Sequence, residues 1–374
     1  MPQDEVVSLF TELAAMPSPP GDERAVADRV GSYMADLGLD VSEDDAGGKI
    51  GSNAGNLYAR AEPTDGGTPL FLCAHLDTVP PEAGIEPVLE EGVIRNAAGT
   101  ILGADNKSAV AVMLEATRRL LAENRRHGGV ELLFTPKEEV GLHGAAAFDH
   151  ERLEARIGYV YDQAAPIGEV ILGAPYAHSM EVKFHGRAAH SGMYPEEGRS
   201  AIAAASKAIS DLKLGRVDEE SSANVGLIRG GTAGNIVPEW CTFLAEARSH
   251  DSEKLADMVR ELLETATFAA SLEDCQVETE VHKSYSGYRF KRDDLAVRLA
   301  ASALERTGYQ PSYTLSGGAA DANVFNERGL ACVNLANGMA EIHTPDEHIA
   351  VSDLERMVDV SLALVDVARE TDAA

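Results

Sequence analysis

Residues 69–78, PLFLCAHLDT, form a short apolar run that ends in a histidine and an aspartate. Such a run, bounded by Pro69 and by the polar residues after it, is typical of a strand that is buried on both faces. Open α/β sheets place their ligands at the carboxyl ends of such strands. We therefore expect His75 and Asp77 to lie at a sheet edge where ligands bind.

The segments around this strand alternate between strand and helix patterns. Residues 56–62, 130–136 and 157–163 are short apolar runs bounded by turn residues, and residues 108–123 have the spacing of an amphipathic helix. Two further helices are expected within residues 6–39. The alternation predicts an α/β fold with a central mixed, mostly parallel sheet flanked by helices.

The pattern changes between residues 178 and 288. This part contains a strand, a helix, two strands, a second helix and a final strand, which is the order of a compact ferredoxin-like α+β domain. After it, helix and strand patterns of the first kind resume. We therefore expect a catalytic domain formed by residues 1–177 and 289–374, with residues 178–288 inserted as a second domain.

The composition excludes some classes of partner. The formal charge is −29, so nucleic acid and anionic membranes would be repelled. The first ten residues are acidic without an apolar core, and no apolar run is long enough to span a bilayer, so we expect a cytoplasmic protein. The four scattered cysteines indicate reduced thiols. The acidic surface suits either a high-salt cytoplasm or ordinary solvation, and the composition leaves both open.

Polar side chains recur at the ends of the predicted strands. The residues concerned are His75, Asp77, Asp105, Glu138, Glu139, Asp162 and His343. A parallel sheet would gather them along one edge. Two imidazoles and several carboxylates without thiolates suit a pair of zinc ions, and a carboxylate can bridge two cations. Of two adjacent glutamates, one can bind metal while the other removes a proton from water.

Each of these signals has an ordinary explanation when it is taken alone. A histidine two residues before an aspartate is often part of a structural turn, and adjacent glutamates usually lie on a solvated surface. Asp162 could be a helix N-cap, and His343 could be a surface imidazole. The order of the segments, each at a strand end, favours the metal site over these alternatives.

The same segments resemble the M20 metallopeptidase family over nearly the whole chain, and within it the peptidase T-like branch of tripeptide aminopeptidases. The motifs are AHLDTVP (74–80), GADNKSA (103–109), PKEEVG (136–141), YDQ (161–163) and IHTPDE (342–347). The resemblance implies a di-zinc catalytic domain with an inserted lid and dimerisation domain. It also implies two Zn²⁺ ions per subunit, which Co²⁺ or Mn²⁺ could replace given the oxygen-rich ligands.

By this resemblance, His75 and Asp162 hold one zinc ion, Glu139 and His343 hold the other, and Asp105 bridges the two. Two further roles follow from the same motifs. Glu138 is the expected general base, and Asp77 is expected to fix the tautomer and orientation of His75. The peptide bond between Asp105 and Asn106 corresponds to a cis bond of the family.

Further residues resemble the substrate-binding positions of the family. His190, in GRAAHSGMYPEEGRSAI, would stabilise the oxyanion in the active site of a partner subunit. Asn235 and Arg248 would grip the substrate backbone or its terminal carboxylate. Gly317 and Gly318 would let the backbone approach the ligand. The alternatives are a turn histidine, a salt bridge within the domain for Arg248, and a tight turn for the glycines.

The resemblance implies a homodimer that hydrolyses the N-terminal peptide bond of short peptides. Tripeptidases of the branch carry an arginine before the two glycines, where this chain has Ser316, and their last histidine motif differs from IHTPDE. A carboxypeptidase or N-acyl-amino-acid deacylase of the same family is therefore the alternative. A binding protein without catalysis would lack the base or the ligands, and all of them are present.

Overall fold

The computed structural model describes residues 3–371, and the chain divides into two compact units. Unit 1 is Met1–Gly173 with Arg289–Ala374, and unit 2 is Ala174–Tyr288. The boundary at residue 178 expected from the sequence lies inside strand β9 (Tyr176–His185), because the strand begins before its alternating pattern becomes clear.

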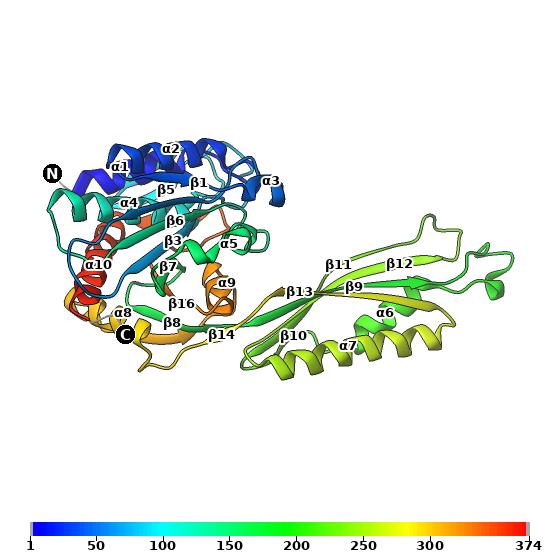
Figure 1. Cartoon of the computed structure of the whole chain (residues 1–374). Coiled ribbons are helices and arrows are strands. Elements are labelled where there is room, and N and C mark those ends of the chain that lie inside the picture. Colours follow the sequence, from blue (N-terminus) through cyan, green and yellow to red (C-terminus); the bar gives the residue numbers. More distant parts are fainter. Residues whose placement is uncertain (1–2, 372–374) are drawn as a thin grey trace. The chain divides into compact units, whose positions relative to one another are not determined.

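A mixed sheet forms the centre of unit 1 (Figure 1). Its strands, in spatial order, are β1 (Val41–Glu43), β2 (Leu57–Ala61), β6 (Val130–Thr135), β3 (Leu70–His75), β7 (Ile157–Gln163), β16 (Ala331–Ala336), β8 (Glu169–Ala174) and β14 (Tyr288–Arg289), with β15 (Ser312–Leu315) beside β8. The central strands β6, β3, β7 and β16 are parallel, whereas β2 and β8 pair with them antiparallel. The predicted fold class is therefore confirmed.

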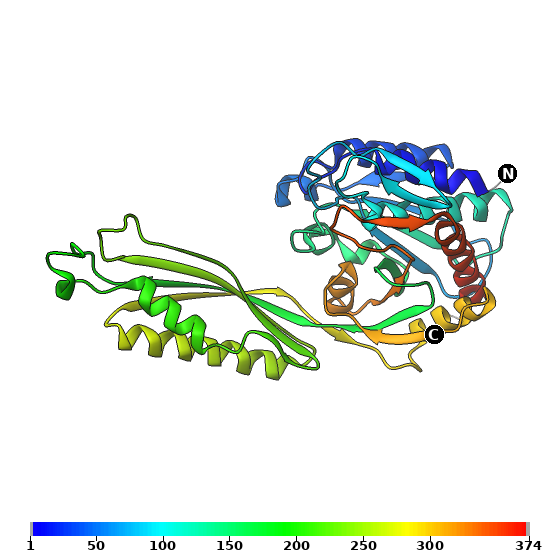
Figure 2. The ribbon, with the colours of Figure 1, turned by 180° about the vertical axis from the view of Figure 1, so that it is seen from behind.

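Helices cover both faces of this sheet (Figures 1 and 2). One face carries α1 (Gln3–Ala14), α4 (Ala104–Ala122), α8 (Leu295–Arg306) and α10 (Val351–Arg369), and the other carries α5 (His143–Ala147) and α9 (Asp321–Glu327). The Tyr159 hydroxyl donates to the Ala296 carbonyl of α8, and the ring of Phe71 lies 4.9 Å from that of Phe325 in α9. Every residue of β3 is buried, as expected for a strand covered on both sides.

Helix α4 differs from its predicted amphipathic character. Its residues from Ala104 to Thr117 are all buried, including Lys107 and Glu115. The reason is that α4 contacts β3 and β7 on one side and α1 and α10 on the other. The polar residues that would mark a solvent face in an isolated helix are therefore covered by its neighbours.

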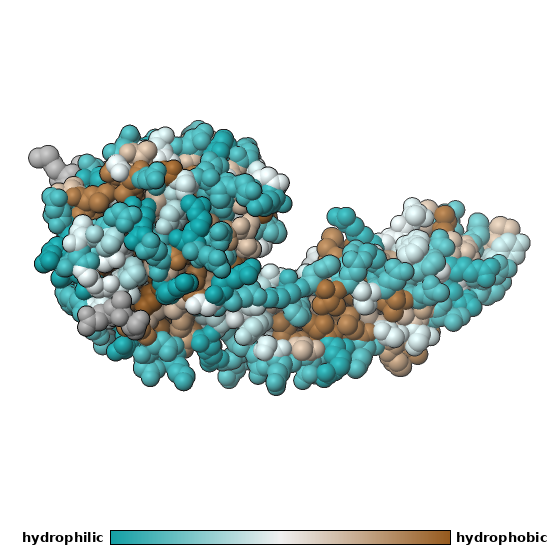
Figure 3. Space-filling view, in the orientation of Figure 1, coloured by the Kyte–Doolittle hydropathy of each residue, from teal (hydrophilic) through white to brown (hydrophobic). Residues whose placement is uncertain are grey.

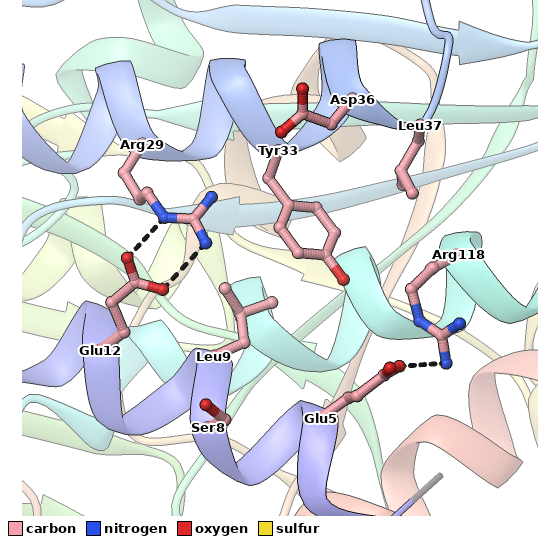
Figure 4. A pocket seen from close by; sticks show the side chains of 9 residues that line it. All are labelled: Glu5, Ser8, Leu9, Glu12, Arg29, Tyr33, Asp36, Leu37 and Arg118. Atoms are coloured by element: carbon pink, nitrogen blue, oxygen red, sulfur yellow. Dashed lines mark hydrogen bonds and ion pairs between the residues drawn. The ribbon is translucent and has the colours of Figure 1, made fainter.

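Surface ion pairs join helix α1 to its neighbours α2 (Arg24–Asp36) and α4. Helix α2 contributes Arg29, which donates two hydrogen bonds to Glu12 of α1 at 2.6 and 2.8 Å, and Arg118 of α4 pairs with Glu5 (Figure 4). The groove between them is lined by residues of these helices and by Leu37. Exposed pairs of this kind contribute about 0.2–1 kcal/mol each, so we assign this groove a packing role.

A small second sheet of unit 1 was not expected from the sequence. It consists of β17 (His348–Ala350), β5 (Val93–Asn96) and β4 (Pro87–Glu90). Ala340 and His348 also exchange two backbone hydrogen bonds of 3.0 and 3.1 Å. These bonds close the loop that carries His343. The remaining short helices of the unit are α3 (Ala46–Ile50) and the 3₁₀ turn η1 (His150–Arg152).

Unit 2 is an antiparallel sheet with two helices on one face (Figures 1 and 2). Its spatial order is β10 (Gly215–Asp218), β11 (Ser221–Gly230), β12 (Trp240–Ser249), β9 and β13 (Gln276–Tyr285), with helices α6 (Ala201–Asp211) and α7 (Ser252–Leu272) and the 3₁₀ turn η2 (Pro195–Glu197). Apart from the short β10, this is the ferredoxin-like order predicted from the sequence.

Hydrophilic residues cover most of the visible surface, as the formal charge of −29 suggests (Figure 3). The same view shows apolar residues gathered in patches on unit 2. Among residues 3–371, no helix is both long and apolar enough to cross a membrane. Cys73, Cys241 and Cys332 are buried thiols, and Cys275 is partly buried.

Candidate active site

The carboxyl edge of the parallel strands in unit 1 gathers the predicted metal ligands. His75 ends β3, Asp162 lies near the end of β7, and Glu139 follows β6. Asp105 lies at the start of α4, and His343 lies between β16 and β17. Because β6, β3 and β7 are parallel neighbours, the loops that follow them meet at one place.

Asp105 lies between the two imidazoles. Its Oδ1 is 3.2 Å from Nε2 of His75, and its Oδ2 is 3.2 Å from Nε2 of His343. The peptide bond that follows it is cis, as the resemblance implied. Each oxygen of this carboxylate thus faces a different histidine, which is the arrangement that a bridging ligand requires.

The other carboxylates complete two groups of donors. Asp162 Oδ1 is 3.7 Å from Nε2 of His75, and Glu139 Oε1 is 3.1 Å from Nε2 of His343. The donor atoms of His75, Glu138 and Asp162 also lie within 4.8 Å of one another, as do those of His75, Asp105 and Glu139. Glu139 therefore lies near His75 and Asp105 as well as 3.1 Å from the imidazole of His343.

Asp77 acts differently from the expectation. Nδ1 of His75 donates to the backbone carbonyl of Asp77 at 2.8 Å, whereas the Asp77 carboxylate is 3.7 Å away. That carboxylate instead accepts the backbone N–H groups of Glu138 at 2.9 Å and Glu139 at 3.2 Å. Asp77 therefore orients His75 through its main chain, and its buried side chain holds the two glutamates in place.

The turn that carries Glu138 and Glu139 has an unusual backbone. Lys137 has a φ of +58°, and its ammonium group donates to the Ile50 carbonyl at 2.7 Å. A Cβ on Gly144 would lie 2.3 Å from the carbonyl oxygen of Pro136, so α5 packs directly on this turn. These contacts fix the backbone position of the two glutamates.

Protons and charges are strongly coupled in the site. Burial lowers the pKa of His75, but hydrogen bonds to Asp105 and Asp162 outweigh it and raise that pKa well above its ordinary value. Hydrogen bonds to Asp105 and Glu139 raise the pKa of His343 to about 10. The neighbouring carboxylates therefore stabilise the protonated, positively charged form of both imidazoles.

The carboxylates show the complementary effect. Burial raises the pKa of Glu138 well above its ordinary value. Burial, and to a lesser extent the negative charge of Asp105, raise the pKa of Asp162 to about 7. For Asp105, burial is outweighed by hydrogen bonds from His343 and His75, which lower its pKa. The site concentrates more negative charge than its imidazoles can neutralise.

This donor set fits divalent metal ions. Cations would supply the positive charge that the buried carboxylates lack, and the imidazole nitrogens already point at the carboxylate oxygens. Imidazole and carboxylate ligands without thiolate suit zinc, and also cobalt or manganese. The predicted ligands are thus brought together in a geometry compatible with two ions.

Several supporting residues were missed from the sequence. Asn334 exchanges hydrogen bonds of 2.9 and 3.1 Å with the backbone of Asp162. Asp321, buried below the site, accepts from the Thr135 hydroxyl at 2.5 Å. Glu347 accepts the backbone N–H of Asp105. Glu347 stands within the IHTPDE motif, and Asp321 lies three residues after Gly318, but a local pattern does not show that their partners are far along the chain.

The predicted residues of unit 2 are partly brought together. Ser191 donates its backbone N–H to the Asn235 carbonyl at 3.0 Å, and Val237 donates to Ala189 at 2.9 Å. The exposed loops that carry His190 and Asn235 are therefore paired. Nδ1 of His190 accepts N–H groups of Gly192 and Met193, each at 3.2 Å, so a neutral His190 carries its proton on Nε2.

Arg248 lies elsewhere in unit 2, on β12. Its guanidinium donates to both oxygens of Glu246, at 2.6 and 3.1 Å, and lies over the ring of Tyr285. This is the salt bridge within the domain that was considered as the alternative. The guanidinium has five N–H donors, so its pairing with Glu246 does not by itself exclude a role in binding a substrate carboxylate.

Gly317 and Gly318 belong to unit 1. Neither has a positive φ, a Cβ on Gly317 would meet nothing within 4 Å, and one on Gly318 would meet only the Ser316 hydroxyl at 4.0 Å. The fold itself therefore does not require glycine at these positions. This leaves close approach of a ligand as a physical reason for the pair.

A family model described as Peptidase family M20/M25/M40 matches residues 71–366. This span covers most of the 374 residues, and the chain belongs to that family of peptidases. The resemblance drawn from the motifs and the prediction of a hydrolytic enzyme are confirmed.

Individual relatives extend over the whole chain. The uncharacterized protein YqjE of Bacillus subtilis is 37% identical over 98% of this chain and 99% of that protein. The structure of aminopeptidase PepT from Bacillus cereus is 38% identical, covers 98% of both chains and has a TM-score of 0.91. A tripeptidase structure from Staphylococcus aureus is 33% identical, covers 99% of both chains and has a TM-score of 0.95.

Proposed function

We propose that this protein is a di-zinc aminopeptidase that removes the N-terminal residue of short peptides. The observation that carries the proposal is the position of Asp105, whose two oxygens face His75 and His343 at 3.2 Å each. The similarity to an aminopeptidase and to a tripeptidase over nearly the full chain supports the substrate class.

The two metal ions would be held by His75 and Asp162 on one side and by Glu139 and His343 on the other, with Asp105 between them. When bound, they would supply Lewis acidity, which polarises a carbonyl group and lowers the pKa of water. The protein itself supplies the groups that position these ions, move protons and stabilise charge.

Glu138 is the proposed proton carrier. It is buried, its donor atom lies within 4.8 Å of those of His75 and Asp162, and Asp77 holds its backbone N–H. Its raised pKa, caused first by burial, suits a group that accepts a proton near neutral pH. It would take the proton of the attacking water and deliver it to the leaving amine.

We further propose that the protein works as a homodimer through unit 2, the lid and dimerisation domain (residues 178–288 by sequence). Strand β10 pairs with β11 only as far as Ala223, so within the described residues no strand pairs with the outer edge of β11 beyond that point. Leu227 and Ile228 are exposed there, and Ile202 is exposed on α6. An open apolar edge of this kind favours pairing with a second copy.

In such a dimer, His190 of the partner subunit would donate from Nε2 to the oxyanion that forms on the attacked carbonyl. Asn235 would bind the substrate backbone, and Gly317 and Gly318 would line the site. Arg248, which pairs with Glu246, would bind a substrate carboxylate.

The test is a substrate panel with the zinc-loaded protein: dipeptides, tripeptides, N-acetylated tripeptides and N-acyl amino acids. Release of the first residue from free-amine peptides alone, with no release after chelation of the metal, is the expected result. Hydrolysis of the acylated compounds instead would assign the protein to the deacylases or carboxypeptidases of the family. Metal analysis should find two zinc ions per chain, and cobalt or manganese should restore activity to the stripped protein.

A further inference from the structure

Glu347 is a buried acid of the IHTPDE segment that the proposed mechanism does not use. Its relative exposure is 1%. Its Oε2 accepts the backbone N–H groups of Leu102 at 2.7 Å and Gly103 at 2.8 Å, and its Oε1 accepts the N–H of Asp105 at 2.9 Å. A carboxylate that is removed from water keeps its charge only when it receives such hydrogen bonds, so both oxygens are engaged.

The three N–H groups belong to the backbone that presents the central carboxylate of the site. Gly103 has a φ of +79° and is the residue at which the chain enters α4. Hydrogen bonds to Leu102, Gly103 and Asp105 hold the backbone on both sides of this point. The bonds therefore determine the direction in which the Asp105 side chain leaves the backbone.

The other end of the contact is the loop that carries His343. Glu347 is four residues after His343, and its backbone N–H donates to the Thr344 carbonyl at 3.2 Å. His343 has a φ of +62°, and its side chain is 45% exposed although Nε2 faces Asp105 and Glu139. Glu347 is the point where this loop is bound to the backbone beside Asp105, more than 240 residues earlier.

A buried lysine lies close to this acid. Lys107 is fully buried, interacts electrostatically with Glu347 and Asp77, and donates from Nζ to the Met16 carbonyl. Lys107 therefore links the backbone at Met16 to the buried surroundings of Glu347 and Asp77.

We propose that Glu347 is a positioning residue for the dimetal site: it fixes the backbone of Asp105 relative to the loop of His343 and so sets the affinity for the second metal ion. This inference rests on the dimetal function proposed above. Replacing a group that orients a metal ligand without touching the metal changes metal affinity or activity by about 10–100-fold. The ion held by Glu139 and His343 is expected to be affected most.

The variant Glu347→Gln isolates this role because it keeps the size of the side chain. One carboxylate oxygen becomes an NH₂ group, which donates and cannot accept, so at least one of the three backbone N–H groups loses its partner. Glu347→Asp is a second variant, in which the charge remains but the side chain is one methylene shorter.

Glu131→Gln is the matched control. Glu131 is also 1% exposed and uses both oxygens, accepting from Ala155 at 2.7 Å, Glu154 at 3.2 Å and the Tyr58 hydroxyl at 2.5 Å. It lies near the start of β6, whereas the metal site lies beyond the end of that strand. Loss of a hydrogen bond at this position should lower the melting temperature without changing the metal site.

The experiment measures Zn²⁺ and Co²⁺ binding to the stripped full-length chain by calorimetry and chelator competition, together with the Co²⁺ absorption spectrum and the melting temperature. We expect the second equivalent to bind Glu347→Gln and Glu347→Asp about 10–100-fold more weakly. The Co²⁺ spectrum should change, and excess metal should restore kcat with little change in KM. The Glu131→Gln control should bind both equivalents as the wild type does.

Equal affinity of wild type and both Glu347 variants for the second ion would overturn the inference and leave the dimetal proposal intact. An equal loss of affinity in Glu131→Gln would also overturn it, because general destabilisation would then explain the effect. A wild-type protein that binds a single ion would instead overturn the dimetal proposal, and the inference with it.

Discussion

The proposed metal ligands of unit 1 and the proposed substrate-binding residues of unit 2 differ in how they are held. Asp105, Glu138 and His75 are buried, and the side chain of Asp105 contacts imidazoles from two distant segments of the chain. His190 and Asn235 lie in exposed loops that bind mainly each other. The contrast indicates a metal centre that is organised within one unit, and loops whose role requires a further surface.

The largest expected effect tests proton transfer in unit 1. Glu138→Gln should lower kcat by about 100- to 10,000-fold, because the amide cannot accept a proton from water. Metal content should remain that of the wild type, since the proposed ligands are untouched. Steady-state kinetics and metal analysis check both points, and a loss below about tenfold would assign the proton to another group.

The next effect tests unit 2. His190→Ala should lower kcat by about 100- to 1,000-fold, the usual result of removing one oxyanion donor. Metal content and melting temperature should not change, because His190 is not one of the proposed ligands and lies in an exposed loop. His178→Ala, on the neighbouring strand β9, is the matched control and should retain activity.

Mixing the two inactive variants sharpens this comparison. In a mixed dimer of Glu138→Gln and His190→Ala subunits, one site would combine an intact Glu138 with an intact His190 of the partner subunit. Activity should therefore reappear on subunit exchange. Its absence, with mixed dimers shown by mass spectrometry, would contradict donation of His190 across the dimer.

The stability of the metal-stripped protein should depend on pH because of unit 1. Burial raises the pKa values of Asp162 to about 7 and of Asp77 to about 6 in the folded state, above their ordinary values. The folded state then binds more protons than the unfolded state between about pH 4 and 7, so stability falls as pH rises through this range. The melting temperature should decrease from pH 5 to 7 in the stripped protein and change less in the zinc-loaded protein.

The smallest expected effect concerns the paired glycines. Gly317→Ala should change the free energy of unfolding by less than about 0.5 kcal/mol, because a Cβ there meets nothing within 4 Å. It should raise KM by about tenfold if a substrate approaches this backbone closely, which corresponds to about 1.4 kcal/mol. Gly144→Ala is the contrasting case, since its Cβ would clash with Pro136 and destabilise the fold by about 1–3 kcal/mol. An unchanged KM for Gly317→Ala would remove this glycine from the substrate site.

Much of the fold followed from local patterns. The buried strands β3, β6 and β7 and the helices of unit 2 lie where the apolar spacing predicts them, because each buries a continuous stretch of its own sequence. The short strands β4, β5 and β17 were missed, since a strand of three or four residues has too little pattern to recognise. The buried character of α4 was missed because its covering helices, α1 and α10, are far along the chain.

The candidate site likewise combines features that local sequence predicts with features that depend on distant segments. The sequence by itself determined which residue types stand at the strand ends, and therefore the metal-binding chemistry of His75, Asp105 and His343. Only the tertiary structure decided that the Asp77 carboxylate binds the backbone of the two glutamates, that Arg248 pairs with Glu246, and that Glu347 joins the loops of Asp105 and His343. The physical reason is that a strand end is a local feature of the chain. A hydrogen bond between distant segments exists only once packing has brought donor and acceptor together.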